Sequence, residues 1–335
     1  MRICELISRD NYKDVLDYLD YQARIEQCCK DSLKRKWAYL RHFLEYSCGS
    51  SFNDLEKLNI TFPNYLESAR NDLKACRLSP VTIRRNLLEV RDFYKWAMLY
   101  RPKKYKKVSL IWLDTLKISK SRMNRAGLPD MKYYTLEDVL NLCNFKPVSL
   151  IDQRDRAAVA FLFLSAIRAS AFTSLKIHAI DLDSMTVFQS PSDGVRTKNN
   201  KMMETILLPE SELLEIVKEW HEKVKCELGD GGLFYPVLST DGLRFQNQDS
   251  VGDVASRNKS LRDGVTRLCK RAGIAYRSPH KFRRGHGVYA VKHSRNFEEF
   301  QAYSQNMGHE DPGTTFKYYS KLSHNDIRDV ILKNK

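Results

Sequence analysis

Three short segments near the C-terminal end of the chain set two histidines, an arginine and a tyrosine at defined spacings. His280 stands three residues before Arg283, His309 directly follows a glycine, and Tyr318 comes nine residues after His309. Side chains at positions i and i+3 share one face of a helix, so this histidine and arginine can point at the same ligand. If these side chains serve one site, the chain must fold so that the three segments meet.

The side chains in these segments suit the transfer of a phosphoryl group. The planar guanidinium of Arg283 matches two phosphate oxygens, and a histidine can hold or move a proton near neutral pH. A tyrosine hydroxyl can act as a covalent nucleophile if neighbouring groups stabilise the charge that develops. Together they predict phosphoryl transfer without a metal or another cofactor. Taken singly, each residue could instead be an ordinary surface or capping residue.

The charge of the chain indicates a polyanionic partner. The formal net charge is +15 and the isoelectric point is near 9.4, which favours nucleic acid over a membrane surface. The basic residues run through the whole sequence, so both halves could contact the same long polyanion. A merely basic protein without such a partner is the plain alternative. A length of 335 residues allows two domains, each with its own core.

The cysteines and the apolar runs exclude several classes of protein. None of the eight cysteines forms a C-x-x-C pair and no histidine cluster accompanies them, which argues against a zinc site and a secreted disulfide framework. The N-terminus has no apolar signal core, and no run is long enough to span a membrane. We therefore expect a protein of the reducing cell interior, either cytoplasmic and nucleoid-associated or inside a host cell, with no membrane partner.

The first hundred residues have the apolar periodicity of amphipathic helices, so we expect a helical domain over residues 1–101. Ser79 followed by Pro80 is typical of a helix start, and an apolar stripe follows. Arg84 and Arg85 lie off that stripe and are candidate DNA contacts. A solvated helix face is the alternative explanation for these two arginines.

Residues 102–132 are predicted to connect two domains. The segment opens with a proline and a basic run that contains Lys103 and Lys104, and it has a second break at Gly127 to Pro129. A basic linker can lie on the phosphate backbone of DNA and add affinity that depends on salt and not on sequence. Lys103 and Lys104 are therefore candidate DNA contacts, and a solubilising tether without a partner is the alternative.

Residues 133–335 combine helices with a short stretch of strands. A buried apolar helix ends just before Arg168, where an unpaired guanidinium would be costly and a phosphate ligand would give it a role. Residues 185–189 and 204–208 have the pattern of strands, and the polar turn between them carries Lys198 and Lys201. The fold class expected is mainly α with a small antiparallel β-sheet (α+β).

Together these motifs resemble the tyrosine recombinases of the lambda-integrase and Xer type. That family has H-x-x-R, then Leu-Gly-His, then a tyrosine nine residues further on; here Met307 replaces the leucine, a change that conserves volume. The box around Arg168 is similar to the family's Thr-Gly-Leu-Arg-x-x-Glu. The usual acidic residue is Ala171 here, which puts the support of the site in doubt. The gap between Arg283 and Gly308 is longer than is usual in the family.

The resemblance implies a fold and a set of roles. The opening Leu-Ser-Pro-x-Thr of the helix at residue 78 is similar to the family's SAM-like core-binding domain, which closes over DNA opposite a catalytic domain. Arg168, Arg283 and His309 would bind the scissile phosphate and Tyr318 would attack it. Lys198 would protonate the leaving 5′ oxygen, with Lys201 as the fallback, and His280 would assist proton movement. Tyr319 is the lesser candidate for the nucleophile, and Arg284 is a further candidate DNA contact.

The function implied is site-specific recombination of double-stranded DNA sites through a 3′-phosphotyrosyl intermediate, for the integration or excision of a mobile element. By resemblance, four protomers would assemble on DNA, with the C-terminal tail docking on a neighbour and accessory DNA-bending or directionality factors as further partners. The alternatives within the family are an Xer-type resolvase of chromosome or plasmid dimers and a catalytically inactive DNA-binding relative. Type IB topoisomerase-like relaxation or telomere resolution would use the same residues.

Overall fold

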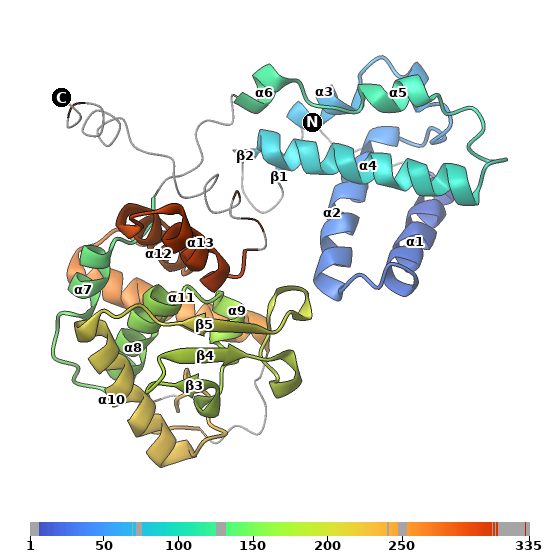
Figure 1. Ribbon diagram of the computed structural model, residues 1–335. Coiled ribbons are helices and arrows are strands. Elements are labelled where there is room, and N and C mark those ends of the chain that lie inside the picture. The colour runs from blue at the N-terminus through green and yellow to red at the C-terminus, as the bar shows by residue number, and fades with distance from the viewer. Residues whose placement is uncertain are drawn as a thin grey trace. The chain divides into compact units, whose positions relative to one another are not determined.

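The chain folds into two compact units, and each is described here by itself. The computed structural model describes residues 7–68, 70–71, 76–124, 132–239, 241–246, 253–309, 311, 313 and 332. The first unit spans Met1–Met131 and the second spans Lys132–Lys335 (Figure 1). Each unit has its own large buried apolar cluster, so each forms a separate hydrophobic core.

The first unit is a set of helices around an aromatic core, as its periodicity predicted. Its larger elements are α1 (Arg9–Arg24), α2 (Lys30–Ser47), α3 (Phe62–Ser68) and α4 (Pro80–Tyr100). A 3-10 turn, η1, spans Leu55–Lys57, and the short strands β1 (Arg70–Asn71) and β2 (Cys76–Arg77) pair antiparallel. The buried rings that fill the centre include Tyr18, Phe43, Phe52, Phe93 and Tyr94.

The start of α4 forms as its sequence predicts. The side-chain oxygen of Ser79 accepts a hydrogen bond from the Thr82 N–H at 3.2 Å, and Pro80 is the first helical residue. Such a cap satisfies one of the backbone donors that every helix start leaves unpaired. Arg84 and Arg85 lie on the exposed face of α4.

The described part of the segment predicted to be a linker belongs to the first unit. It contains α5 (Leu110–Thr115) and α6 (Lys120–Asn124). The side chains that it buries in the aromatic core are Tyr105, Val108, Leu113 and Leu116. Because these apolar side chains are covered while the lysines around them stay exposed, the segment extends the first unit instead of running free beside it.

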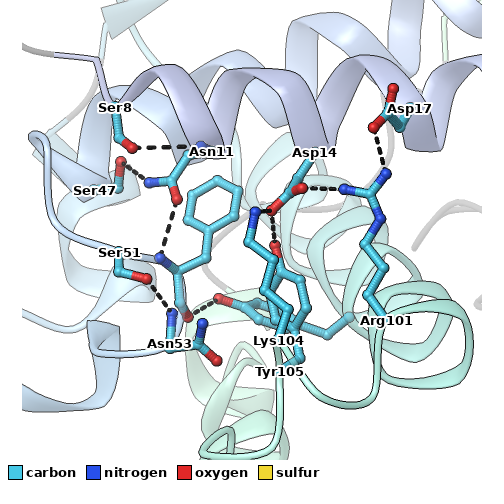
Figure 2. A network of polar contacts seen from close by, with 12 residues as sticks. Ser8, Asn11, Asp14, Asp17, Ser47, Ser51, Asn53, Arg101, Lys104 and Tyr105 are labelled. Carbon is cyan, nitrogen blue, oxygen red and sulfur yellow. Dashed lines mark hydrogen bonds and ion pairs between the residues drawn. The ribbon is translucent and has the colours of Figure 1, made fainter.

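A buried carboxylate holds the beginning of this extension. Asp14 on α1 is 1% exposed, and Figure 2 shows it facing Arg101, Lys104 and Tyr105. Arg101 and the Tyr105 hydroxyl donate hydrogen bonds to it, and Lys104 Nζ lies 2.6 Å from Asp14 Oδ2. A carboxylate in a core needs such partners because its desolvation is costly. The amine of Lys104 is therefore already paired with an acid of the same unit.

The second unit surrounds one long buried helix. Its helices are α7 (Leu136–Cys143), α8 (Leu150–Ser165), α9 (Ala169–Phe172), α10 (Ser211–Leu228), α11 (Val254–Ala272), α12 (His280–His293) and α13 (Phe297–Asn306). Helix α8 packs against α7, α10, α11 and α12 (Figure 1), and residues 157–164 of it are all buried. That burial on every side explains why the α8 sequence is apolar all round near its end.

A three-stranded antiparallel sheet completes the second unit. Its order is β3 (Ile180–Asp181), β4 (Thr186–Gln189) and β5 (Met203–Ile206), with single 3-10 turns η2 (Ile177–Ala179), η3 (Pro191–Asp193) and η4 (Lys198–Asn200) nearby. Strands β4 and β5 agree with the two predicted strands within two residues. The predicted fold class, mainly α with a small antiparallel sheet, is confirmed.

The structure also describes thiols, groups of metal-binding side chains and helix lengths. Cys48 is disulfide-bonded, whereas Cys28, Cys29, Cys143, Cys226 and Cys269 are free. Over the residues that the structure describes, no group of three or more metal-binding side chains is present. None of the helices in that part of the chain has the length and apolar character needed to cross a membrane.

Candidate active site

Arg283 connects its own segment to the Met307–His309 segment and to the end of α8, just before Arg168. It lies in the first turn of α12 with 3% of its surface exposed. Its Nη1 donates to the carbonyl oxygen of Ala166 at 2.6 Å, and its Nη2 donates to the carbonyl oxygen of Met307. The same Nη2 lies 3.2 Å from His309 Nε2. One guanidinium therefore contacts the end of α8, the Met-Gly-His turn and its histidine.

The chain reverses direction at Ala166 to present Arg168. Helix α8 ends at Ser165, and Ala166 adopts the left-handed conformation with a φ of 51°. Arg168 is then the N-cap of α9, and it is half-buried. Non-glycine residues seldom adopt a positive φ, so the bond from Arg283 to the Ala166 carbonyl stabilises an unfavourable turn. This explains how Arg168 and Arg283 come to lie near each other.

The two histidines lie among cations. Burial, and after it the charges of Arg283, Arg168 and Lys198, lower the pKa of His309 to about 4. The protein atoms packed around His280 lower its pKa, and so do Arg283 and Arg168, even though its side chain stays exposed. Both imidazoles are thus neutral at pH 7, and an anion placed between these cations would raise both pKa values.

Lys198 is presented by a tight turn between β4 and β5. Asn199 and Asn200, which follow it, have φ angles of 58° and 52°. Asparagine tolerates this left-handed region better than most residues, so the Asn-Asn pair supports the turn. Lys198 is exposed, and its charge is one of those that lower the pKa of His309. The charge of Lys198 therefore acts on the same histidine that Arg283 contacts.

Five of the predicted site residues therefore lie close enough for their charges to act on one another or on a shared histidine. They are Arg168, Lys198, His280, Arg283 and His309. Tyr318 and Tyr319 lie outside the described residues. Arg284 is half-buried on α12 and contributes to the lowered pKa of His280. Lys103 is exposed, as are Arg84 and Arg85, whereas Lys104 is paired with Asp14.

Tyr134 is a supporting residue that the sequence did not reveal. Its ring is fully buried and stacks on Phe282 with centroids 4.1 Å apart. Its hydroxyl accepts a hydrogen bond from the Arg277 N–H and donates one to the Arg277 carbonyl, both at 2.7 Å. Tyr134 thereby holds the start of α12, and no spacing rule links it to residues so far along the chain.

Ala171 stands at the position where the resemblance leads one to expect an acid. It is 1% exposed and packs in the core of the second unit. A carboxylate at this position would be buried and would need a partner of its own. The described cluster of site residues forms without it.

The fold is that of solved integrases. It is similar to a lambda integrase dimer bound to a COC′ core site, at 12% identity and a TM-score of 0.60, over 92% of this chain and 76% of that one. It is also similar to the Tn1549 transposon integrase in complex with circular intermediate DNA, at 15% identity and a TM-score of 0.58, over 95% of this chain and 98% of that one.

Sequence comparison adds the family. Tyrosine recombinase XerC of Lactobacillus delbrueckii subsp. bulgaricus is 23% identical over 269 residues, which cover 77% of this chain and 80% of the relative. The sequence model described as the phage integrase family matches residues 132–325, more than half of the chain. The chain therefore belongs to the phage integrase family, and it is a tyrosine recombinase by family, as its motifs predicted.

Proposed function

We propose that this protein is a site-specific DNA recombinase that cleaves and rejoins strands through a covalent bond between Tyr318 and a 3′ phosphate. The observation that carries the proposal is the convergence of Arg168, Arg283 and His309, with Lys198 close enough to act on the same histidine. The net charge of +15 supports DNA as the partner.

Arg283 is arranged to receive a phosphate without rearranging. Its bonds to the Ala166 and Met307 carbonyls hold the plane of the guanidinium before DNA binds. Donors fixed in advance stabilise the charge of a transition state more effectively than donors that must reorient. Arg168 and Arg283 would hold the two non-bridging oxygens, and His309 would donate a further hydrogen bond as a neutral imidazole.

The proposed reaction moves one bond and two protons. The phenol oxygen of Tyr318 forms a bond to phosphorus as the bond from phosphorus to the 5′ oxygen breaks. His280, neutral at pH 7, accepts or relays the phenol proton, and Lys198 donates a proton to the departing 5′ oxygen. Attack by a 5′ hydroxyl on the phosphotyrosine reverses the step, so the covalent bond conserves the energy needed for rejoining.

Four exposed or half-buried cations are proposed to contact DNA outside the scissile phosphate. Arg84 and Arg85 on α4 and Lys103 after it are open to solvent, and Arg284 follows Arg283 on α12. Contacts of this kind go to backbone phosphates and set the position of the protein on the duplex. Lys104 would have to leave Asp14 to take part, so we expect the smallest contribution from it.

The finer biological role is also a proposal. We infer integration or excision of a mobile element, by four protomers on two DNA sites with the C-terminal tail docking on a neighbour, assisted by accessory DNA-bending or directionality factors. An Xer-type resolvase of chromosome or plasmid dimers would use the same site on a different DNA target. In either role the protein would work at DNA inside a cell, in the nucleoid or in a host.

A nicked suicide substrate tests the chemistry. Tyr318→Phe should abolish the covalent adduct between protein and DNA while DNA binding in a mobility-shift assay stays intact, because only the nucleophilic oxygen is removed. Tyr319→Phe is the matched control and should form the adduct normally. An adduct that persists in Tyr318→Phe and disappears in Tyr319→Phe would move the nucleophile by one residue, and no adduct from the wild-type chain would refute a catalytic role.

A further inference from the structure

The last residue of α13 bonds to the outer edge of the sheet. The Asn306 side-chain oxygen accepts a hydrogen bond from the Ile206 N–H at 2.7 Å, and its amide nitrogen donates to the Ile206 carbonyl at 2.9 Å. Strand β5 is the edge of the sheet, whose order is β3-β4-β5. An edge strand has backbone groups without a strand to pair with, and here one side-chain amide takes the place of that neighbour.

The direction of the Ile206 backbone follows from the register of the sheet. Leu207 N–H donates to the Met185 carbonyl at 2.8 Å, so the adjacent residue Ile206 turns its N–H and C=O away from β4. Ile206 therefore presents one donor and one acceptor side by side at the sheet edge. The amide of asparagine carries both the complementary acceptor and the complementary donor. A hydrophobic side chain has neither group, and a carboxylate has only the acceptor.

A second close approach lies two residues further along. Gly308 has a φ of +69°, and a Cβ atom built on it would lie 2.1 Å from Cε of Met203, the first residue of β5. The segment from Asn306 to Gly308 thus runs along β5 at close distance, and His309 follows directly. Figure 1 shows α13 beside the sheet, in agreement with the contacts between α13 and β5.

These contacts join the two segments that carry Lys198 and His309. Lys198 lies on the turn that leads into β5, and His309 lies on the turn that leaves α13. The two segments are about a hundred residues apart in sequence. The side chain of Asn306 joins them directly through its hydrogen bond from the Ile206 N–H. A shift of β5 against α13 would move the lysine relative to the histidine and the arginine that contacts it.

We propose that Asn306 is a positioning residue that sets the Lys198 amine against the phosphate held by Arg283 and His309. Its side-chain amide bonds to the backbone of Ile206. By fixing the position of β5, it fixes the Lys198 turn, and so the distance from the Lys198 amine to the leaving 5′ oxygen that it protonates. The inference rests on the proposed recombinase function and assigns a part of its geometry that the motif residues do not cover.

The test compares two leaving groups. On ordinary DNA the departing 5′ oxygen needs a proton from Lys198, whereas a 5′-bridging phosphorothiolate releases a sulfur whose acidity lets it depart without one. Single-turnover cleavage by saturating protein should therefore be about 10- to 100-fold slower for Asn306→Ala than for wild type on ordinary DNA, since a displacement of about 1 Å can cost two orders of magnitude in rate. On the phosphorothiolate, Asn306→Ala and Lys198→Ala should both approach the wild-type rate.

Matched variants separate positioning from folding. Asn296→Ala removes the cap at the other end of α13, where the Asn296 side chain accepts from the Glu299 N–H at 2.8 Å, and it leaves β5 untouched. This control should lower the melting temperature and keep the wild-type ratio of rates on the two substrates. Asn306→Asp keeps an acceptor for the Ile206 N–H but sets a carboxylate against the Ile206 carbonyl, so it should be impaired on ordinary DNA and recover on the phosphorothiolate.

The outcomes separate the positioning role of Asn306 from the proposed recombinase function. Equal slowing of Asn306→Ala on both substrates, or a wild-type rate on ordinary DNA, would overturn the positioning role while the recombinase proposal stands. Failure of the wild-type chain to cleave either substrate would overturn the proposed function itself. Recovery of Lys201→Ala but not Lys198→Ala on the phosphorothiolate would show that Asn306 does not act through Lys198.

Discussion

Adding a single methyl group to α12, by Gly285→Ala, should displace Arg283 and slow DNA cleavage. Gly285 lies two residues after Arg283, and a Cβ built on it would lie 1.8 Å from the carbonyl oxygen of Tyr134. Real Cβ contacts essentially never fall under 3.0 Å, so Gly285→Ala must separate the two elements by at least 3.0 − 1.8 = 1.2 Å. Tyr134 stacks on Phe282 of α12 and bonds to the Arg277 backbone just before that helix, so the separation displaces the start of α12 relative to these contacts.

The two consequences of this movement have different sizes. Alanine is favoured over glycine inside a helix by about 1 kcal/mol, whereas overpacking a core costs about 1–3 kcal/mol, so the free energy of unfolding should fall by about 0–2 kcal/mol. The rate should fall more steeply. A shift of this size breaks the 2.6 Å bond between Arg283 and the Ala166 carbonyl, and misplacing a catalytic group by about 1 Å costs about 100-fold.

The assay pairs thermal unfolding with single-turnover cleavage of the suicide substrate. Gly231→Ala is the control because a Cβ at Gly231 meets no heavy atom within 4 Å, and it should leave both stability and rate unchanged. Gly285→Ala should bind DNA but cleave about 100-fold more slowly. A Gly285→Ala protein that cleaves at the wild-type rate, with an unchanged or higher melting temperature, would refute the argument that the Tyr134 contact fixes α12.

Three further predictions follow from single contacts. Asp14→Ala should lower the free energy of unfolding by about 2–3 kcal/mol in a urea titration, because it leaves Arg101 and Lys104 without their buried acid; a loss below about 1 kcal/mol would contradict this. His286 is fully buried and its pKa is lowered to about 4 from 6.5, so the unfolded chain binds more protons between these values and stability falls as the pH drops through them. From pH 7 to pH 5, His286→Phe should lose about 2 kcal/mol less than wild type, and equal losses would count against the buried neutral imidazole. Replacing Arg84 and Arg85 together by alanine should weaken binding to all DNA sequences and reduce the slope of log affinity against log salt by about 2, and an unchanged slope would remove them from the interface.

Local patterns of the sequence were sufficient for the starts of several helices and for naming the candidate site residues. Ser79 with Pro80 predicts the start of α4, and Thr135 with Asp138 forms the capping box that begins α7. The spacing of His280 and Arg283 sets them on one helical turn, and the family motifs identify the remaining partners. The helix caps and the spacing of His280 and Arg283 depend on residues within one or two turns of each other. They can therefore be predicted from the sequence without knowing the fold.

Long-range packing decided what supports those residues. The basic composition after Arg101 predicted a connection between domains. The burial of Tyr105 and its bond to Asp14 could not be predicted from that composition, because only the approach of α1 creates them. Asn306 and Tyr134 carry no motif, and each acts by meeting a backbone group far away in the sequence. The sequence by itself determined the family and the candidate side chains for binding and attacking a phosphate. The tertiary structure decided how Arg283, Ala166 and His309 come together, because the register between distant segments depends on packing that no local pattern encodes.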